Sequence, residues 1–177
     1  CDGSTYKLLV SSQDHKRVFD GDKGPNTGGM GAYGPAPMVT PKLLNQIETK
    51  ILQPTIDGMS AEGSPYKGLL YVGIIQTDAG PKVMEYNCRF GDPETQAVLP
   101  LLDGDLAEIM LACCNGSLDK VAVRSMNRFA LCVVIASGGY PGSYKKGLPV
   151  SGLEEAAGIP NVEIFHAGTK IDGETVV

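Results

Sequence analysis

The sequence has no apolar run that approaches the roughly 18 residues needed to span a membrane. Residues 1–5 contain neither a basic nor an apolar segment, so nothing at this end of the chain directs export. The five cysteines are odd in number and show no C-x-x-C spacing, and most of them lie in apolar runs. We therefore expect reduced, mostly buried thiols in a cytoplasmic protein with no membrane partner.

A stripe of lysine and arginine is also absent. The chain has 15 basic and 20 acidic residues, which gives a net charge of −5. Nucleic-acid binding needs a basic patch, so we expect no nucleic-acid partner. Hydrophobic residues make up 42% and charged residues 20% of the 177 positions, which excludes a disordered tail and a fibrous repeat. The length predicts one main domain with a smaller appendage.

Glycine and proline are abundant, with 23 and 12 residues. Residues 11–41 form a polar stretch rich in both, much longer than the usual connection of about 4–6 residues. This stretch predicts a functional or a disordered loop. Before it, residues 4–10 are typical of the second strand of a hairpin whose first strand is missing. We therefore expect the chain to begin inside a domain.

The local patterns predict an α+β fold with a mixed or antiparallel sheet. Residues 66–76 and 81–87 predict two antiparallel strands joined by a turn at 77–80. Helix signals follow from apolar spacing and capping residues. The expected helices cover residues 41–60 with an interruption at Pro54, a segment that starts with Asp92 as N-cap and Pro93 in the first turn, and residues 106–115 up to Gly116.

A change in composition near residues 118–127 predicts a domain boundary. We expect residues 1–117 to form one domain and residues 118–177 to form a small, partial α+β domain. Its expected elements are a strand over 129–136, a short helix over 154–157 and a hairpin across Asp172 and Gly173.

Three polar residues alternate along the end of the second predicted hairpin strand. Glu85, Asn87 and, if the strand persists, Arg89 would project from one face, because alternate strand residues share a side. Carboxylate and amide oxygens suit Mg²⁺, and the arginine fork suits a phosphate or acyl phosphate. The alternative interpretation is the polar outer face of a half-exposed strand.

The long loop carries a second candidate site. It contains Asp14 and Lys16, followed by a glycine-rich segment, residues 26–31. Closely spaced glycines allow backbone N–H groups to approach an anion, while the aspartate and the lysine could bind an amine and a carboxylate or phosphate. The segment lacks the Walker and dinucleotide-binding signatures. By itself it is also compatible with a flexible turn.

Taken together, the two elements resemble a known family. The segments are QDHKR, GPNTGGMGAY and KVMEYNCRFGDPETQ, with GYPG and FHAGT further along the chain. They are similar, nearly end to end, to phosphoribosylamine–glycine ligases (glycinamide ribonucleotide synthetases) of the ATP-grasp superfamily. The resemblance implies an enzyme of purine biosynthesis that uses ATP to make glycyl phosphate. The amine of 5-phosphoribosylamine then attacks this intermediate.

The resemblance also implies roles for individual residues. Glu85 and Asn87 would bind Mg²⁺ or Mn²⁺, and Arg89 would contact the phosphate or acyl phosphate as the catalytic residue. The substrate-side contacts would be made by Asp14, Lys16, Asn26, Thr27, Gly28, Gly29 and Gly31. Many ATP-grasp relatives carry a further acidic ligand on the neighbouring strand, but residues 69–76 hold no carboxylate. Glu85 and Asn87 would then be the whole protein contribution to the metal.

The resemblance covers the back half of an ATP-grasp domain and most of a C-terminal domain. The N-terminal domain and the ATP-clamping lobe lie outside it, so we expect the chain to be inactive without them. Two alternatives stay open. The parent could be another ATP-grasp carboxylate–amine ligase, or the chain could be a non-catalytic module of a purine-pathway polypeptide.

Overall fold

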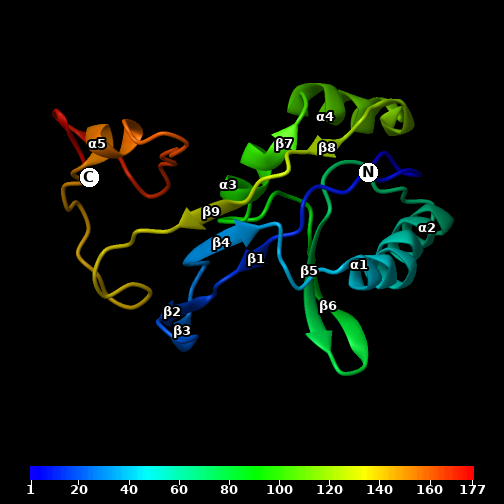
Figure 1. The fold of residues 1–177 in the computed structure, drawn as a ribbon, viewed down its shortest axis with the longest axis horizontal. Helices are drawn as coiled ribbons and strands as arrows, with labels where there is room; N and C mark the ends of the chain where they lie inside the picture. Colours follow the sequence, from blue (N-terminus) through cyan, green and yellow to red (C-terminus); the bar gives the residue numbers. More distant parts are fainter. The chain divides into compact units, whose positions relative to one another are not determined.

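The computed structural model describes residues 1–177, which divide into two compact units. The first unit contains residues 1–15 and 31–133, and the second contains residues 16–30 and 134–177. Figure 1 shows the ribbon with its helices and strands labelled. Every strand pair is antiparallel, and helices accompany the strands in both units. The expected α+β class is confirmed.

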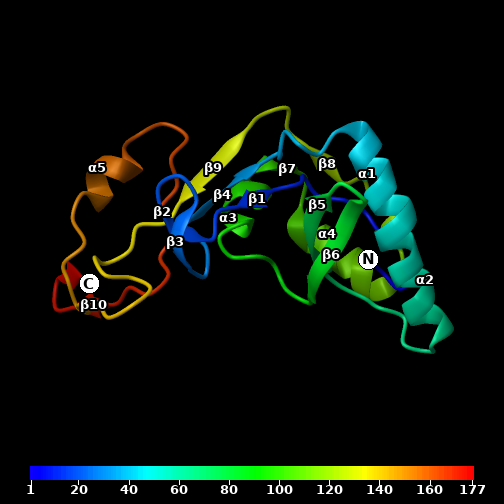
Figure 2. The same ribbon diagram turned by 90° about the horizontal axis from the view of Figure 1, so that it is seen from below.

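A three-stranded sheet forms part of the first unit, with β4 in the centre. Its strands are β1 (Gln13–Asp14), β4 (Gly31–Gly34) and β9 (Ala130–Val133). A Cβ atom on Gly31 would lie 2.5 Å from the carbonyl oxygen of Cys132, so this close approach of β4 to β9 requires glycine. The short helix α3 (Thr95–Val98) packs against β4 and β9, as Figure 2 shows, and buries Ala97 there.

The predicted hairpin is confirmed as β5 (Tyr71–Thr77) and β6 (Gly80–Asn87). Its register shifts by one residue between Gly73 and Ile74. A regular register counted from the turn would place Tyr71 opposite Tyr86, but the shift places Tyr71 opposite Asn87. The bulge therefore decides which residues share a face near the open end of the hairpin.

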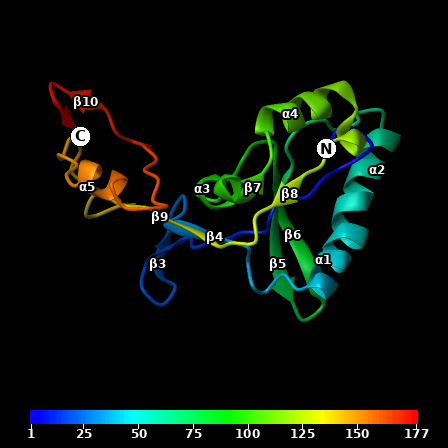
Figure 3. The ribbon, with the colours of Figure 1, turned by 45° about the horizontal axis from the view of Figure 1, so that its top comes forward.

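Two helices run end to end beside the hairpin, as Figures 1 and 3 show. They are α1 (Pro41–Ile47) and α2 (Gln53–Ala61), joined by a π-helical segment (Glu48–Leu52). The Oγ1 atom of Thr40 accepts a hydrogen bond from the N–H of Leu43 and caps α1. The predicted helix is confirmed. Its interruption precedes Pro54, because this proline has no N–H and its ring crowds the carbonyl four residues earlier.

Helix α4 (Leu106–Asn115) has the predicted bounds. The carboxylate of Asp105 accepts hydrogen bonds from the N–H groups of Ala107 and Glu108 at 2.8 and 3.2 Å. Gly116 ends the helix with a φ of 67°, which glycine adopts without strain. The helix buries Ile109 against Leu118, which opens a 3-10 turn (Leu118–Lys120). The remaining pair in this unit is β7 (Leu102–Asp103) with β8 (Arg124–Ser125).

Four sequence-based expectations are wrong. The thiols are not mostly buried, because Cys1, Cys113 and Cys132 are only partly buried and Cys88 and Cys114 are exposed. Residues 4–10 form no strand, because the side chain of Asp2 folds the chain into a turn by accepting the N–H groups of Ser4 and Thr5. Asp92 is not an N-cap, since α3 begins only at Thr95 and the Asp92 carboxylate accepts instead from the amide of Gln96. Residues 11–41 are not a plain loop but contain four short strands.

The second unit contains two hairpins and one helix. Its elements are β2 (Arg17–Phe19), β3 (Lys23–Asn26), α5 (Leu153–Ala157), β10 (Ile171–Asp172) and β11 (Thr175–Val176). The predicted terminal hairpin and short helix are confirmed. The predicted domain boundary between residues 117 and 118 stays a prediction. No helix combines the length and the apolar character required to cross a membrane.

Candidate active site

One face of the hairpin carries the two predicted metal ligands. Glu85 lies opposite Gly73, and Asn87 lies opposite Tyr71. A Cβ atom on Gly73 would approach Cγ of Glu85 to 3.1 Å, so the glycine leaves room for the glutamate side chain. The neighbouring residue Tyr86 points to the other side, where its hydroxyl lies 2.8 Å from Oγ1 of Thr55 in α2. The face of Glu85 and Asn87 is therefore turned away from α2.

Tyr71 connects this face to carboxylates from other segments. Its hydroxyl donates a hydrogen bond to Oε1 of Glu94 at 2.6 Å, and the Glu94 side chain is buried. Burial raises the pKa of Tyr71, as do the hydrogen bond to Glu94 and the charges of Glu94, Asp14 and Glu85. The carboxylates of Asp14 and Glu85 are thus both close enough to act on the same phenol.

Arg89 lies just beyond the end of β6, and its side chain is exposed. Its Nη1 atom donates a hydrogen bond to the carbonyl of Phe90 at 2.8 Å. A guanidinium has five N–H donors in a planar fork. Arg89 can therefore hold this backbone contact while the rest of its fork faces a ligand.

A divalent cation fits the residues on the hairpin face. The side-chain nitrogen of Asn87 is buried and has no hydrogen-bond partner, which costs on the order of 1–3 kcal/mol. A flip of the amide would present its oxygen at the same place, and a cation beside the exposed Glu85 carboxylate would satisfy it. No group of three or more histidine, cysteine, aspartate or glutamate residues could hold a metal ion. A site built on one carboxylate and one amide suits a cation that keeps water and phosphate oxygens as its other ligands.

The glycine-rich loop is held by hydrogen bonds within the second unit. The carbonyl of Lys16 accepts the N–H and the hydroxyl of Thr27 at 2.7 and 2.8 Å, and the Lys16 ammonium donates to the carbonyl of Gly28. The N–H of Gly29 donates to Oγ1 of Thr27, and the N–H of Gly28 donates to the hydroxyl of Tyr140 at 3.2 Å. Anion binding by these amides would therefore have to replace existing acceptors.

The predicted site residues fall into both units. The first unit contains the metal-ligand pair and three further residues, Asp14, Gly31 and Arg89. The second contains Lys16 and residues 26–29, with Asn26 at the end of β3 opposite Arg17. The structure therefore groups Asp14 with the hairpin face and Lys16 with Thr27 and Gly28.

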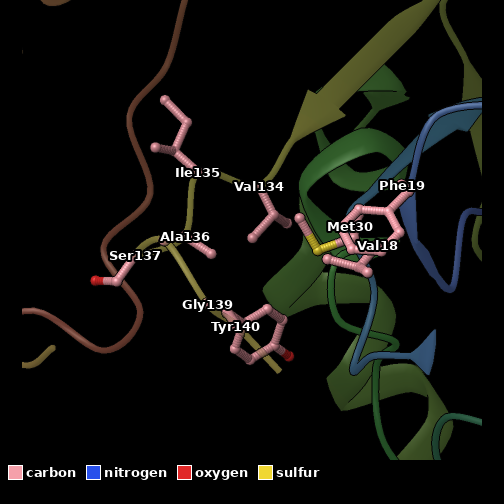
Figure 4. Close-up of a pocket in the computed structure, with 10 residues that line it drawn as sticks. Val18, Phe19, Met30, Val134, Ile135, Ala136, Ser137, Gly139 and Tyr140 are labelled. Atoms are coloured by element: carbon pink, nitrogen blue, oxygen red, sulfur yellow. The ribbon is translucent and has the colours of Figure 1, made fainter. Parts of the chain in front are cut away.

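A mostly apolar hollow of about 420 Å³ lies in the second unit, shown in Figure 4. Val18, Phe19 and Met30 form one side, and the segment after β9, which includes Tyr140, forms the other. It contains none of the predicted site residues. The hollow borders the glycine-rich loop, because Met30 belongs to that loop and the Tyr140 hydroxyl accepts a hydrogen bond from the N–H of Gly28.

Three residues near these sites have no functional signal in the sequence. Tyr71 shares the face of Asn87 only because of the bulge, which the hydrophobic pattern does not show. Glu94 resembles an ordinary first-turn acid of a helix, and the structure turns it toward Tyr71 instead. Tyr140 is part of GYPG, but its contact with Gly28 joins residues far apart in the chain.

Comparison with known families gives two matches. Residues 1–95 match the family described as Phosphoribosylglycinamide synthetase, ATP-grasp (A) domain. Residues 130–177 match the Phosphoribosylglycinamide synthetase C domain. The Glu85–Asn87 hairpin and the glycine-rich loop both lie within the first match.

Individual proteins give the same result. The chain is 56% identical over 176 residues to the bifunctional purine biosynthetic protein ADE1 of Schizosaccharomyces pombe, with coverage of 99% of this chain and 22% of the relative. It is 50% identical over 173 residues to phosphoribosylamine–glycine ligase of Synechocystis sp., covering 97% of this chain and 41% of the relative. The crystal structure of phosphoribosylamine–glycine ligase from Thermotoga maritima superposes with a TM-score of 0.83 at 33% identity, covering 99% of this chain and 42% of that one. The chain thus spans less than half the length of these relatives.

Proposed function

The chain belongs to the phosphoribosylglycinamide synthetase family, and we propose that it forms the metal-bearing part of a ligase that joins glycine to 5-phosphoribosylamine at the expense of ATP. This proposal rests on Glu85 and Asn87, which share one face of the hairpin, and on the buried side-chain nitrogen of Asn87, which has no hydrogen-bond partner. The family matches support it, because they cover both this hairpin and the C-terminal segment.

The proposed reaction has two steps. A glycine carboxylate oxygen attacks the γ-phosphorus of ATP, which gives glycyl phosphate and ADP. The amine of 5-phosphoribosylamine then attacks the glycyl carbonyl carbon, phosphate leaves, and the nitrogen loses a proton to give the amide. Neither step needs a nucleophilic side chain, so the demands on the protein are charge neutralisation and positioning.

Glu85 and Asn87 supply two oxygen ligands for Mg²⁺ or Mn²⁺. When bound, the cation would neutralise charge on the polyphosphate. Arg89 extends beyond the same end of β6, and its fork can bind two oxygens of a phosphoryl group or of the acyl phosphate. These three residues would hold the transferred group at the open end of the hairpin.

Asp14 and Lys16 are the proposed substrate-side contacts. The carboxylate of Asp14 acts on Tyr71 from near the metal face, where an amine substrate would meet a negative charge. The other proposed substrate-side contacts are Asn26, Thr27, Gly28, Gly29 and Gly31. Gly31 also lets β4 approach β9 closely. Adenine binding and closure over ATP are proposed to come from lobes outside this chain.

Substrate omission tests this function in the full-length protein. ADP release should require glycine and 5-phosphoribosylamine together, and it should disappear when either is left out. The alternative function is that of another ATP-grasp carboxylate–amine ligase. ADP release with a different acid and amine, together with none with glycine and 5-phosphoribosylamine, would favour that alternative and contradict the proposal.

A further inference from the structure

We propose that Tyr71 and Glu94 are positioning residues that hold the Glu85–Asn87 face in its metal-binding arrangement. This inference rests on the proposed function. It deepens that function by naming residues that do not touch the cation but decide how well its ligands are placed.

The first observation is the position of Tyr71 on the metal face. Directly opposite residues of an antiparallel pair lie about 4.5–5.5 Å apart and project to the same side. Tyr71 therefore stands beside Asn87, and its neighbour on that face, Gly73, stands beside Glu85. Residues 69–76 hold no carboxylate, so the proposed metal ligands come from β6 alone.

The second observation is the anchorage of Glu94. Only 4% of its surface is exposed, and its backbone carbonyl accepts the N–H groups of Ala97 and Val98 at 3.0 and 2.9 Å. Both of these residues are buried in α3, which packs against β4 and β9. Glu94 is thus fixed to the core of the first unit. The hydrogen bond from the Tyr71 hydroxyl to Glu94 therefore attaches the start of β5 to this fixed carboxylate.

The third observation is that Gly91 packs closely against the Tyr71–Glu94 hydrogen bond and has no room for a side chain. A Cβ atom there would lie 2.5 Å from Oε2 of Glu94 and 3.0 Å from the ring of Tyr71. Residues 88–91 connect the end of β6 to the turn before α3 and carry Arg89. The Tyr71–Glu94 bond closes this connection into a loop, with Asn87 at one end and Gly91 packed against the bond.

These contacts together define what the bond does. It fixes the end of β6 relative to α3, and therefore the direction in which Asn87 and the following Arg89 point. Outer partners that orient metal ligands affect metal affinity by about 10–100-fold in other proteins. The side-chain nitrogen of Asn87 has no protein partner, so no hydrogen bond from it orients the amide, and the amide depends on this kind of support.

Binding of Mn²⁺ to the full-length protein with a non-hydrolysable ATP analogue, followed by electron paramagnetic resonance, tests the inference. Tyr71→Phe removes only the hydroxyl, and we expect Mn²⁺ to bind about tenfold more weakly. The apparent KM for the metal should rise while the KM for glycine stays unchanged. Tyr86→Phe is the matched control, since it removes a hydrogen-bonded hydroxyl from the opposite face of the same hairpin.

Glu94 provides a second series in case Tyr71→Phe folds poorly. Glu94→Leu removes the acceptor and should weaken Mn²⁺ binding as Tyr71→Phe does. Glu94→Gln keeps an oxygen that can accept the hydrogen bond from the Tyr71 hydroxyl. It should therefore retain more Mn²⁺ affinity than the leucine variant. The affinity of the double variant Tyr71→Phe/Glu94→Leu should equal that of either single variant, because the two residues act through one bond.

Two negative results have different meanings. If Tyr71→Phe and Tyr86→Phe lower thermal stability alike and both leave Mn²⁺ affinity unchanged, the bond is structural only and the inference is overturned. If Glu85→Gln binds Mn²⁺ as tightly as the unmodified protein, the metal site itself is wrong and the proposed function loses its main support.

Discussion

The carboxylate of Asp2 accepts a hydrogen bond from the backbone N–H of Leu118 at 3.1 Å, across 116 residues of chain. The same carboxylate accepts the N–H groups of Ser4 and Thr5. Both Asp2 and Leu118 are almost completely buried, with 4% and 1% of their surfaces exposed. The side chain of Asp2 therefore ties the start of the chain to the turn that follows α4.

This relationship predicts an acid-sensitive contribution to stability. Burial alone would raise the pKa of Asp2, but the hydrogen bonds from Thr5, Ser4 and Leu118 outweigh it and lower the pKa from 3.8 to about 2. The folded state thus favours the ionised carboxylate. Its contribution is complete above the unfolded pKa of 3.8 and is lost as the pH falls toward 2.

Asp2→Ala should lower the free energy of unfolding by about 2 kcal/mol near neutral pH, because several backbone donors lose their acceptor. Urea unfolding of both proteins between neutral pH and pH of about 2 measures the effect. The difference between them should shrink through the acid range. A difference that stays constant with pH would show that the Asp2 charge is not what stabilises this contact.

Arg89→Lys should lower kcat/KM about tenfold or more, which corresponds to roughly 1.4 kcal/mol of transition-state stabilisation. Lysine keeps the charge but loses the planar fork. Arg124→Lys, in the exposed strand β8, is the control and should leave kcat/KM unchanged. Steady-state kinetics of ADP release give both values, and an Arg89→Lys value equal to that of the control would remove Arg89 from the site.

Substitution by alanine should have different effects at Gly28 and at Gly31 of the glycine-rich loop. At Gly28 a Cβ atom would meet only the Tyr140 hydroxyl at 3.5 Å, an ordinary contact, so Gly28→Ala should fold normally. If the loop contacts substrate, that variant raises the KM for glycine or 5-phosphoribosylamine. At Gly31 the same atom would collide with the backbone carbonyl of Cys132, so Gly31→Ala should lower the melting temperature.

Unfolding curves and substrate KM values for both variants separate these effects. Normal KM values in Gly28→Ala would mean that the loop is a connector. Unchanged stability in Gly31→Ala would mean that β4 and β9 can move apart to accept a side chain.

Sequence patterns predicted the elements whose signals are local. Helix α4 had the predicted bounds because Gly116 is a stop signal that acts within one turn of the helix, and the structure adds Asp105 as its N-cap. The hairpin of β5 and β6 was predicted from its turn and apolar strands. The central strand β4 was not predicted, because it pairs with β9 roughly a hundred residues later, and no local pattern reports such a pairing.

The candidate site divides in the same way. The alternation of Glu85 and Asn87 along a strand is a property of the sequence, and so it was available before the fold. The opposite positions of Tyr71 and Asn87 depend on a one-residue bulge, and the burial of Glu94 depends on how α3 packs. The ligands of the proposed metal were therefore predictable, but the residues that position them were not.

The central claim is that Glu85 and Asn87 bind the catalytic metal. The metal dependence of turnover in the variants Glu85→Gln and Asn87→Leu tests it most directly. ADP release by the full-length protein should be measured across Mg²⁺ and Mn²⁺ titrations, alongside thermal unfolding. Met84→Gln is the control, because Met84 is a largely exposed neighbour on the same strand that lacks a metal ligand. We predict that both site variants lose turnover at metal concentrations that saturate the control, while all three proteins unfold at similar temperatures. Normal turnover at low metal in either site variant would contradict the account.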